Sequence, residues 1–269
     1  MTLCFWIFHL NGEGCRSRYF IAIKKNRGEV LTTMDNYIPL IASGFKFYAD
    51  PFLFKYQGIN YLFFEDYNYK KGVISYVTLD QKGIPSSPGL ALQLPTHLSF
   101  PHLFEGDGVI YMTPETFQRR SISLFKSVQF PNQWKHERVL VSGEYFSDPI
   151  VFRKDGLYWL FAAIHTDELV IYYAKDLNSE FFPHPINNEK KKGRNAGGVF
   201  LWKGKLVRPV MNCTRKYGES MTLKEIVILT TEEFLERELF VIQPDWAPNL
   251  VGTHTFSLNE DFVVYDGQL

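Results

Sequence analysis

The sequence predicts an all-β fold, a five-bladed β-propeller with four antiparallel strands in each blade. Three observations predict it: aromatic residues are abundant, helical patterning is almost absent, and a hairpin-like segment recurs along the chain. The 269 residues include 24 Phe, 15 Tyr and 5 Trp beside 19 Gly and 14 Pro. Because aromatic residues favour strands and Gly and Pro favour turns, many short strands joined by turns are expected.

The repeated segment is anchored on a phenylalanine in its first strand. Five segments align on this residue, at spacings of 50, 48, 48 and 56 residues. The anchors are Phe54, Phe104, Phe152, Phe200 and Phe256. A glycine follows four residues after each of the first four anchors, and Glu260 occupies that place in the fifth. An apolar strand, a turn glycine and a second apolar strand are typical of a β-hairpin.

Further strands are expected after the first four hairpins. The third strands are Gly72–Leu79, Ser121–Lys126, Leu169–Ala174 and Glu225–Thr230, and weaker fourth strands include Arg138–Val141 and Leu239–Ile242. Near-continuous apolar runs indicate sheets covered on both faces, as in a propeller. A β-sandwich is the nearest alternative, but it does not predict a fifty-residue period. One helical turn is expected at Thr231–Glu238.

The fifth repeat reaches Leu269 after only two strands, so its blade lacks two. The start of the chain offers Cys4–Leu10 and Tyr19–Lys24 as spare strands. We therefore expect the residues before Phe45 to complete this blade and close the ring, which removes exposed sheet edges. No linker interrupts the chain, so residues 1–269 are expected to form a single domain, with 1–45 as closing strands and lead-in.

Charge and composition exclude several classes of function. Lys plus Arg and Asp plus Glu are both 29, and the longest basic run is only Lys190–Lys192, so no nucleic-acid partner is expected. No apolar stretch reaches the roughly 20 residues of a membrane span, and none is expected. The three widely spaced cysteines, Cys4, Cys15 and Cys213, form neither a disulfide framework nor a zinc site. A reducing, cytoplasmic location is the simplest interpretation.

Carboxylates recur at one phase of the repeat. Asp50 and Asp148 open the first strands of their hairpins, each before a proline, and Glu65 and Glu115 end second strands that return to the same rim. The four are therefore expected around one mouth of the channel. Glycoside hydrolysis uses one carboxyl group as acid and another as base or nucleophile. We assign Asp50 as base or nucleophile, Glu115 as acid and Asp148 as the orienting group; an Asp-Pro that only turns the chain, and a solvated Glu65, are the alternatives.

Other polar and aromatic side chains are expected near this mouth. The candidate substrate-binding residues are His102, Arg194, Arg208, Asn212, Arg215 and His254. Arginines suit a sugar or a phosphate, although each alone is more often structural. His254 is expected to face the channel, where it either binds water or a metal ion or is a hydrogen-bonded core histidine. No other cofactor is expected. Tyr48, Phe100 and Trp202 are candidates for stacking on a sugar.

The five repeats with Asp-Pro pairs on inner strands resemble the five-bladed propellers of the family-43 and family-32 glycosidase superfamily. The strings HLSFPHLF and YMTPET, and the stretch from Arg208-Pro209 to Tyr217-Gly218, resemble more specifically the propeller of plant glucosamine inositolphosphorylceramide transferases. That propeller lies at the N-terminal side of the plant proteins, and bacterial relatives occur alone or joined to formyltransferase-like domains. The resemblance covers residues 19–269.

The glycosidase resemblance implies a base Asp opening blade one, an orienting Asp in blade three and an acid Glu opening blade four. Asp50 and Asp148 match the first two. Ala196-Gly197 stands where the Glu is expected, which leaves Glu115 as the substitute from blade two. His254 resembles the channel histidine of these enzymes, which sometimes sits beside a metal ion.

The resemblance implies a carbohydrate-active domain that acts on a glycosidic linkage, in glycan or surface-polysaccharide metabolism. The alternative is a non-catalytic module that binds a glycan or a nucleotide sugar beside a glycosyltransferase or formyltransferase. A plain protein-interaction propeller ranks last, because it needs no carboxylate cluster. In the plant proteins the transferase chemistry is assigned to a separate C-terminal domain, so a companion transferase domain or subunit is an expected partner, besides a sugar or glycan ligand.

Overall fold

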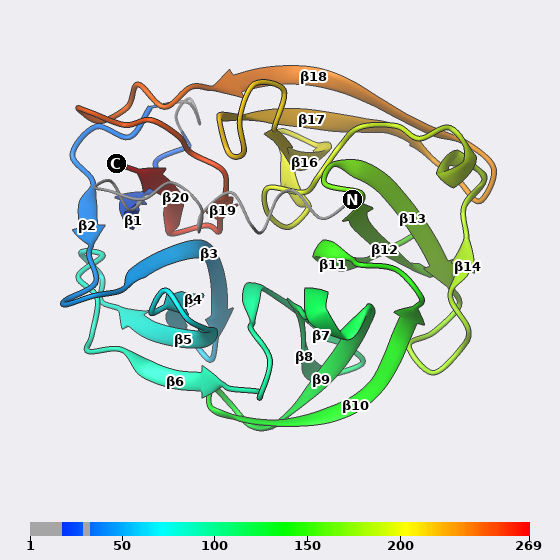
Figure 1. The fold of residues 1–269 in the computed structure, drawn as a ribbon, viewed down its shortest axis with the longest axis horizontal. Helices are drawn as coiled ribbons and strands as arrows, with labels where there is room; N and C mark the ends of the chain where they lie inside the picture. The colour runs from blue at the N-terminus through cyan, green and yellow to red at the C-terminus, as the bar shows by residue number, and fades with distance from the viewer. Residues whose placement is uncertain (1–17, 29–32) are drawn as a thin grey trace.

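The computed structural model describes residues 18–28 and 33–269, and these residues form a five-bladed β-propeller. Five four-stranded antiparallel sheets stand in a ring, as Figure 1 shows, and we use the word channel for the central axis of this ring. In four of the blades the strand order follows the chain, from the channel outward. The predicted fold class is confirmed.

The blades are numbered along the chain. Blade 1 contains β3 (Phe47–Tyr56), β4 (Ile59–Tyr67), β5 (Gly72–Leu79) and β6 (Gly89–Leu92). Blade 2 contains β7 (Ser99–Gly106), β8 (Val109–Glu115), β9 (Ser121–Gln129) and β10 (Gln133–Ser142). Blade 3 contains β11 (Ser147–Lys154), β12 (Leu157–Ile164), β13 (Glu168–Ala174) and β14 (Phe182–Pro183). Blade 4 contains β15 (Phe200–Trp202), β16 (Lys205–Asn212), β17 (Ser220–Leu229) and β18 (Phe234–Ile242).

Blade 5 is built from both ends of the described chain. Its strand order is β19 (Phe256–Leu258), β20 (Phe262–Gln268), β1 (Tyr19–Lys25) and β2 (Ile38–Leu40). Strand β1 pairs with β20 over its whole length, and β2 pairs with β1. Residues before Phe45 therefore close the ring, as predicted. The predicted strand Tyr19–Lys24 is the third strand of this blade, and the predicted strand Cys4–Leu10 lies outside the described residues.

The predicted helical turn at Thr231–Glu238 is wrong, because Phe234–Ile242 is the outer strand β18. Glu and Leu favour a helix, but strand β17 presents a row of backbone groups that β18 satisfies along its length. The helices among the described residues are two short 3₁₀ turns, Phe117–Arg119 and Pro185–Asn188.

No helix in the described residues is both long enough and apolar enough to cross a membrane.

Five separate hydrophobic cores hold the ring together, one between each pair of neighbouring blades. Between blades 5 and 1, for example, Ile21 of β1 packs in the same cluster as Phe64 of β4, and both are fully buried. Each sheet is thus covered on both faces by its neighbours. This arrangement explains why the strands are apolar along most of their length instead of alternating.

The turns of the inner hairpins lie at one end of the channel, which we name the hairpin face. Four of these turns have a positive φ at both central residues, as type I′ turns require, and the second of these is always glycine. The four turns are Gln57-Gly58, Asp107-Gly108, Asp155-Gly156 and Lys203-Gly204. The turn glycines of the repeat are therefore accounted for by hairpin geometry.

The inner strands begin at the opposite end of the channel, which we name the carboxylate face. In blades 1, 2 and 3 the pairing of the first two strands is interrupted there by a bulge. Asp50, Phe100 and Asp148 occupy the bulges with φ of 52°, 45° and 48°, and each precedes a proline. Non-glycine residues rarely adopt this conformation, and it is stable only where surrounding contacts impose it.

Candidate functional site

Buried carboxylates impose the bulge conformation at the carboxylate face. Asp50 Oδ2 accepts a hydrogen bond from Phe100 N at 3.1 Å, and Glu115 Oε2 accepts one from Asp148 N at 2.9 Å. Asp50 N in turn donates to Asp266 Oδ2 at 3.3 Å. Each carboxylate thus holds the opening residue of the next blade. The same side chains are structural staples and the candidate acids and bases of the mouth.

The first group of charges, here named the His254 cluster, consists of Asp50, His254 and Asp266. His254 Nε2 lies 3.3 Å from Asp50 Oδ1, and Nδ1 lies 2.8 Å from Asp266 Oδ2. Because His254 Nδ1 makes no hydrogen bond within the described residues, the second contact is electrostatic. Asp50 Oδ1 also accepts from Thr255 Oγ1 at 2.9 Å. The imidazole is therefore enclosed between two carboxylates.

This enclosure sets the protonation of the His254 cluster. Burial alone would lower the pKa of His254, but the charge of Asp266 and the contacts with both carboxylates raise this pKa well above its usual value. Burial would raise the pKa of Asp50, but the hydrogen bond and charge of His254, with Thr255 and Phe100 N, lower it below its usual value. His254 is thus held as an imidazolium beside an ionised Asp50.

The three side chains also offer ligand atoms within 4.8 Å of one another, which raises the question of a metal ion. Both oxygens of Asp50 already accept hydrogen bonds, and Asp266 Oδ1 accepts two, from His254 N and Thr255 N. A metal ion would also have to displace the imidazolium proton of His254. The residues present fit an imidazolium better than a metal, and we derive no step through a metal ion.

The second group, here named the Arg194 cluster, consists of Glu115, Asp148 and Arg194. Arg194 Nε lies 2.5 Å from Asp148 Oδ2 and Nη2 lies 3.3 Å from Oδ1, so the guanidinium grips this carboxylate with two nitrogens. Arg194 Nη2 is also 3.7 Å from Glu115 Oε2. One cation therefore faces two carboxylates, and Glu115 is the more distant of them.

The pKa of Glu115 is raised, which favours its protonated form. Its side chain is 2% exposed, and burial, followed by the charge of Asp148, raises its pKa well above the usual value despite the opposing charge of Arg194. Arg194 stays protonated: burial opposes its charge, but Asp148, Tyr217 and Glu115 raise its pKa further. The cluster therefore contains a proton donor beside a fixed ion pair.

Tyr217 connects the two clusters. Its ring lies 5.1 Å from the Arg194 guanidinium and 5.3 Å from the His254 ring. Burial raises the pKa of its hydroxyl well above the usual value, so the phenol is neutral. Asp50 and Glu115 are also joined through β7, since Asp50 accepts from Phe100 N and Glu115 pairs with the preceding residue, Ser99. The predicted trio of Asp50, Glu115 and Asp148 is thus brought to one end of the channel.

Glu65 also lies at this face, but it belongs to a separate pair with His97. His97 Nε2 is 3.2 Å from Glu65 Oε1, and His97 Nδ1 accepts from Gly72 N at 2.8 Å. Burial raises the pKa of Glu65, although His97 opposes the shift. Glu65 is 7% exposed, so it is a buried residue and not the solvated turn residue that was the alternative.

Two predicted ligands are buried inside the blades. Arg208 is fully buried and forms a bidentate ion pair with Glu236, at 2.6 and 2.8 Å. Its Nη1 donates to Asn195 Oδ1 at 2.7 Å. His102 is buried against Phe52, its Nε2 is 2.8 Å from the Val151 carbonyl, and burial lowers its pKa to about 4. The structure does not bring either side chain to the mouth.

The other two lie at the turn between β16 and β17. Asn212 bonds Ser220 Oγ at 3.2 Å and Thr214 N at 3.0 Å, which fixes the turn. The side chain of Arg215 is 82% exposed and pairs with Glu219. Arg194 and His254 are therefore the two predicted ligands that join the carboxylate clusters. The predicted stacking residues Tyr48 and Phe100 are buried.

Blade 4 has no space for the acid that the glycosidase pattern places there. Ala196 is fully buried in the core between blades 4 and 5. At Gly197 a Cβ would lie 2.0 Å from the Phe256 carbonyl oxygen, so any larger residue would displace the backbone of blade 5. The departure from the pattern is therefore a packed contact between blades 4 and 5.

Two site residues were missed from the sequence, Asp266 and Tyr217. The spacing from Phe256 places Gly267 at the rim, but the residue that bridges Gly252 there is Gln268. The fifth hairpin therefore has a different pairing register from the others, so the spacing of the repeat did not place Asp266 at the rim. Tyr217 lies in a turn between strands, where the period gives no signal.

Comparison with solved structures defines the class of protein. The chain is similar to a family 117 glycoside hydrolase of Zobellia galactanivorans, with a TM-score of 0.60 and 13% identity over 94% of this chain and 90% of that one. It is equally similar to an α-L-arabinofuranosidase of Podospora anserina, with a TM-score of 0.60 and 11% identity over 89% and 94% of the two chains. The protein has the five-bladed propeller fold of these glycoside hydrolases.

The family is more specific than the fold. Residues 30–245 match the family model described as glucosamine inositolphosphorylceramide transferase 1, N-terminal, and the chain belongs to that family. It is 35% identical over 208 residues to glucosamine inositolphosphorylceramide transferase 1 of Arabidopsis thaliana, covering 72% of this chain and 27% of that protein. The japonica rice protein of the same name is 34% identical over 205 residues, with 71% and 27% coverage. The match thus spans about a quarter of these relatives' length.

Proposed function

We propose that this domain is carbohydrate-active and acts on a glycosidic linkage at the carboxylate face, by hydrolysis or by transfer of the sugar. The observation that carries the proposal is the placement of Asp50 and Glu115 at one end of the ring, in two clusters that share Tyr217. The pKa of Asp50 is lowered there, whereas the pKa of Glu115 is raised. Burial and the charge of Asp148 raise the pKa of Glu115, which suits donation of a proton to a leaving oxygen. Ionised Asp50 suits the role of base or nucleophile. Asp148 is the orienting group: Arg194 fixes its carboxylate, and its backbone N–H donates to Glu115.

The relatives support the same substrate class. The curated relatives are named as transferases of glucosamine, and the similar structures include glycoside hydrolases. We place the domain in glycan or surface-polysaccharide metabolism, beside a companion transferase domain or subunit. A cytoplasmic location would keep the free thiol of Cys213 reduced.

A second candidate function, binding of a glycan or nucleotide sugar without turnover, is favoured by the packed contact at Gly197. In that case Asp50 and His254 would accept and donate hydrogen bonds to sugar hydroxyls. The buried position of Glu115 would then serve only to hold Asp148 N.

One experiment separates the two functions. The protein is incubated with a panel of glycans and nucleotide sugars, and released sugar and bound ligand are both measured. We expect release to fall about 100-fold or more in Asp50→Asn and Glu115→Gln, and to persist in Asp107→Asn, whose carboxylate is exposed on the hairpin face. Binding without release supports the second function. Release that is unchanged in both carboxyl variants contradicts the first, and no binding at all contradicts both.

A further inference from the structure

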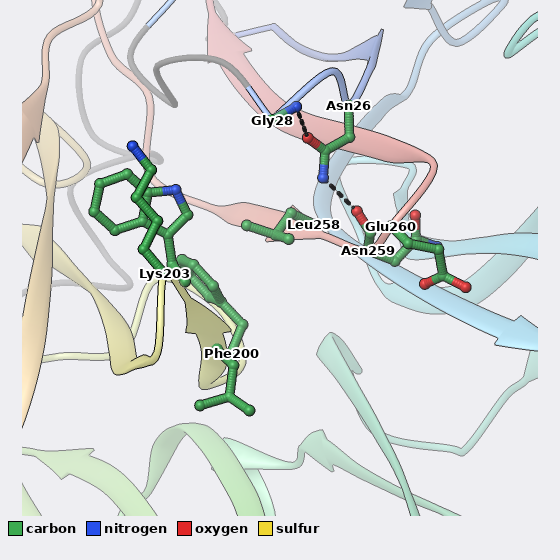
Figure 2. A pocket seen from close by; sticks show the side chains of 9 residues that line it. Asn26, Gly28, Phe200, Lys203, Leu258, Asn259 and Glu260 are labelled. Atoms are coloured by element: carbon green, nitrogen blue, oxygen red, sulfur yellow. Dashed lines mark hydrogen bonds between the residues drawn. The ribbon is translucent and has the colours of Figure 1, made fainter.

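The hairpin face carries a groove between blades 4 and 5, at the end of the channel opposite the two clusters. Its volume is about 490 Å³, within the range of small-molecule sites. One wall is the β15–β16 hairpin with Phe200, Leu201, Trp202 and Lys203, and the other is the β19–β20 turn with Asn259 and Glu260 (Figure 2). None of these residues belongs to the site described above.

The wall formed by the β19–β20 turn is held in place by hydrogen bonds. Asn26 Nδ2 donates to the Asn259 carbonyl at 2.6 Å, and Asn26 Oδ1 accepts from Gly28 N at 3.0 Å, as Figure 2 shows. Asn259 Nδ2 donates to Asn60 Oδ1 at 2.8 Å. Lys55 pairs with Glu260 at 2.9 Å and with the neighbouring Asp261 at 2.8 Å. A ligand would therefore meet a preformed polar wall.

The wall formed by the β15–β16 hairpin, by contrast, offers a side-chain N–H and an ammonium that make no hydrogen bond or ion pair with the described residues. Trp202 packs its ring edge-on against Phe240, at 5.1 Å and 89°, and its indole N–H is bonded to none of the described residues. Lys203 Nζ lies 4.6 Å from the centroid of the Trp202 ring, and within the described part of the chain it pairs with no carboxylate. Leu201 beside them is 74% exposed. An aromatic face, an N–H donor and an ammonium that no carboxylate among the described residues pairs with are thus presented together.

We propose that this groove binds a pyranose that carries an acidic group, either a carboxylate or a phosphate. The C–H face of a sugar ring carries partial positive charge and suits the electron-rich face of Trp202, which the flexible Lys203 side chain now covers. Once displaced from the ring, the ammonium is placed to pair with the acidic group of the same ligand. The proposal does not depend on chemistry at the carboxylate face.

The test is calorimetric titration with glucuronate, glucose 6-phosphate and neutral glucose. The wild type is expected to bind at least one acidic sugar more tightly than glucose, and the two acids separate the carboxylate from the phosphate. Trp202→Ala should weaken binding of the acidic sugar about tenfold, the order of a desolvated cation–π or stacking contact. Lys203→Glu should weaken the acidic sugar and leave glucose unchanged, whereas Lys82→Gln, an exposed lysine elsewhere, should change neither.

Three results would overturn the proposal. They are no binding of either acidic sugar by the wild type, no preference over glucose, and undiminished binding in Lys203→Glu, a surface variant whose fold is not in question. Retained binding in Glu115→Gln is expected, because that residue lies at the other face. Loss of binding there would assign the ligand to the carboxylate face and not to the groove.

Discussion

The His254 cluster and the Arg194 cluster contain the same formal charges, two carboxylates and one cation, yet they behave differently. In the first, the cation is an imidazolium that touches both carboxylates, at 3.3 and 2.8 Å. In the second, the guanidinium grips Asp148 at 2.5 Å and lies 3.7 Å from Glu115. The contact with the imidazolium lowers the pKa of Asp50, whereas burial and the charge of Asp148 raise the pKa of Glu115, which lies farther from its cation. Under the proposed function, the position of the cation in each cluster would therefore help to separate the base, Asp50, from the proton donor, Glu115.

The largest effect is expected from removing the cation that cannot titrate. Arg194→Met leaves the Asp148 carboxylate buried without a counter-ion, which should cost about 3–5 kcal/mol of unfolding free energy. Denaturation by urea measures this loss. Arg153→Met is the matched control, because that arginine is 57% exposed and its Asp107 partner lies at 3.6 Å; a change within about 0.5 kcal/mol is expected. Equal losses in the two variants would show that the Arg194 cluster is not a buried ion pair.

A smaller and pH-dependent effect is expected in the other cluster. The pKa of His254 is raised in the folded protein, so its stabilisation is complete below the usual value of 6.5 and is lost as pH rises through the folded pKa. His254→Gln should therefore cost about 2 kcal/mol in mildly acidic buffer, and progressively less as the wild type loses the imidazolium proton. The measurement is unfolding free energy against pH.

The same titration sharpens the comparison between the clusters. The loss caused by Arg194→Met should not shrink over the range in which the His254→Gln loss shrinks, since a guanidinium does not deprotonate there. If both losses were constant, or if both shrank together, the two cations would be equivalent and the contrast between the clusters would fail.

Most of the fold could be predicted from the sequence because each repeat of the sequence corresponds to one blade. Strand Gly72–Leu79 has the predicted bounds, and Tyr19–Lys24 closes blade 5 as expected. Propensity misled at Thr231–Glu238, where pairing with a neighbouring strand outweighs the helical preference of the residues. Local sequence does not show which segment will pair with the exposed edge of a strand.

The candidate site could be predicted only where it obeys the repeat. Asp50 and Asp148 share one phase of the repeat, and Glu115 lies at a second phase where the chain returns to the same rim, so the spacing placed all three on one face. Asp266 lies in the hairpin with the different pairing register, so the period of the repeat indicated Gly267 in place of Asp266. Arg208 looked like a ligand because it is charged, but the partner that buries it, Glu236, lies on a strand 28 residues later. Contacts between strands of this kind are not encoded in spacing.

The smallest effect on stability is expected at the acid itself. The pKa of Glu115 is raised in the folded protein, so its contribution to stability is complete below its usual value of 4.5 and is lost as pH rises through the folded pKa. At neutral and alkaline pH the wild type therefore carries a cost that a neutral amide does not. Glu115→Gln keeps an acceptor for Asp148 N, now at 2.9 Å from Oε2, and should leave unfolding free energy unchanged or raise it by at most about 1 kcal/mol. The gain should grow with pH and vanish in acid, while any turnover is lost. A variant that is destabilised most at high pH would mean that Glu115 is ionised and paired with Arg194, and the two clusters would then not differ in proton affinity.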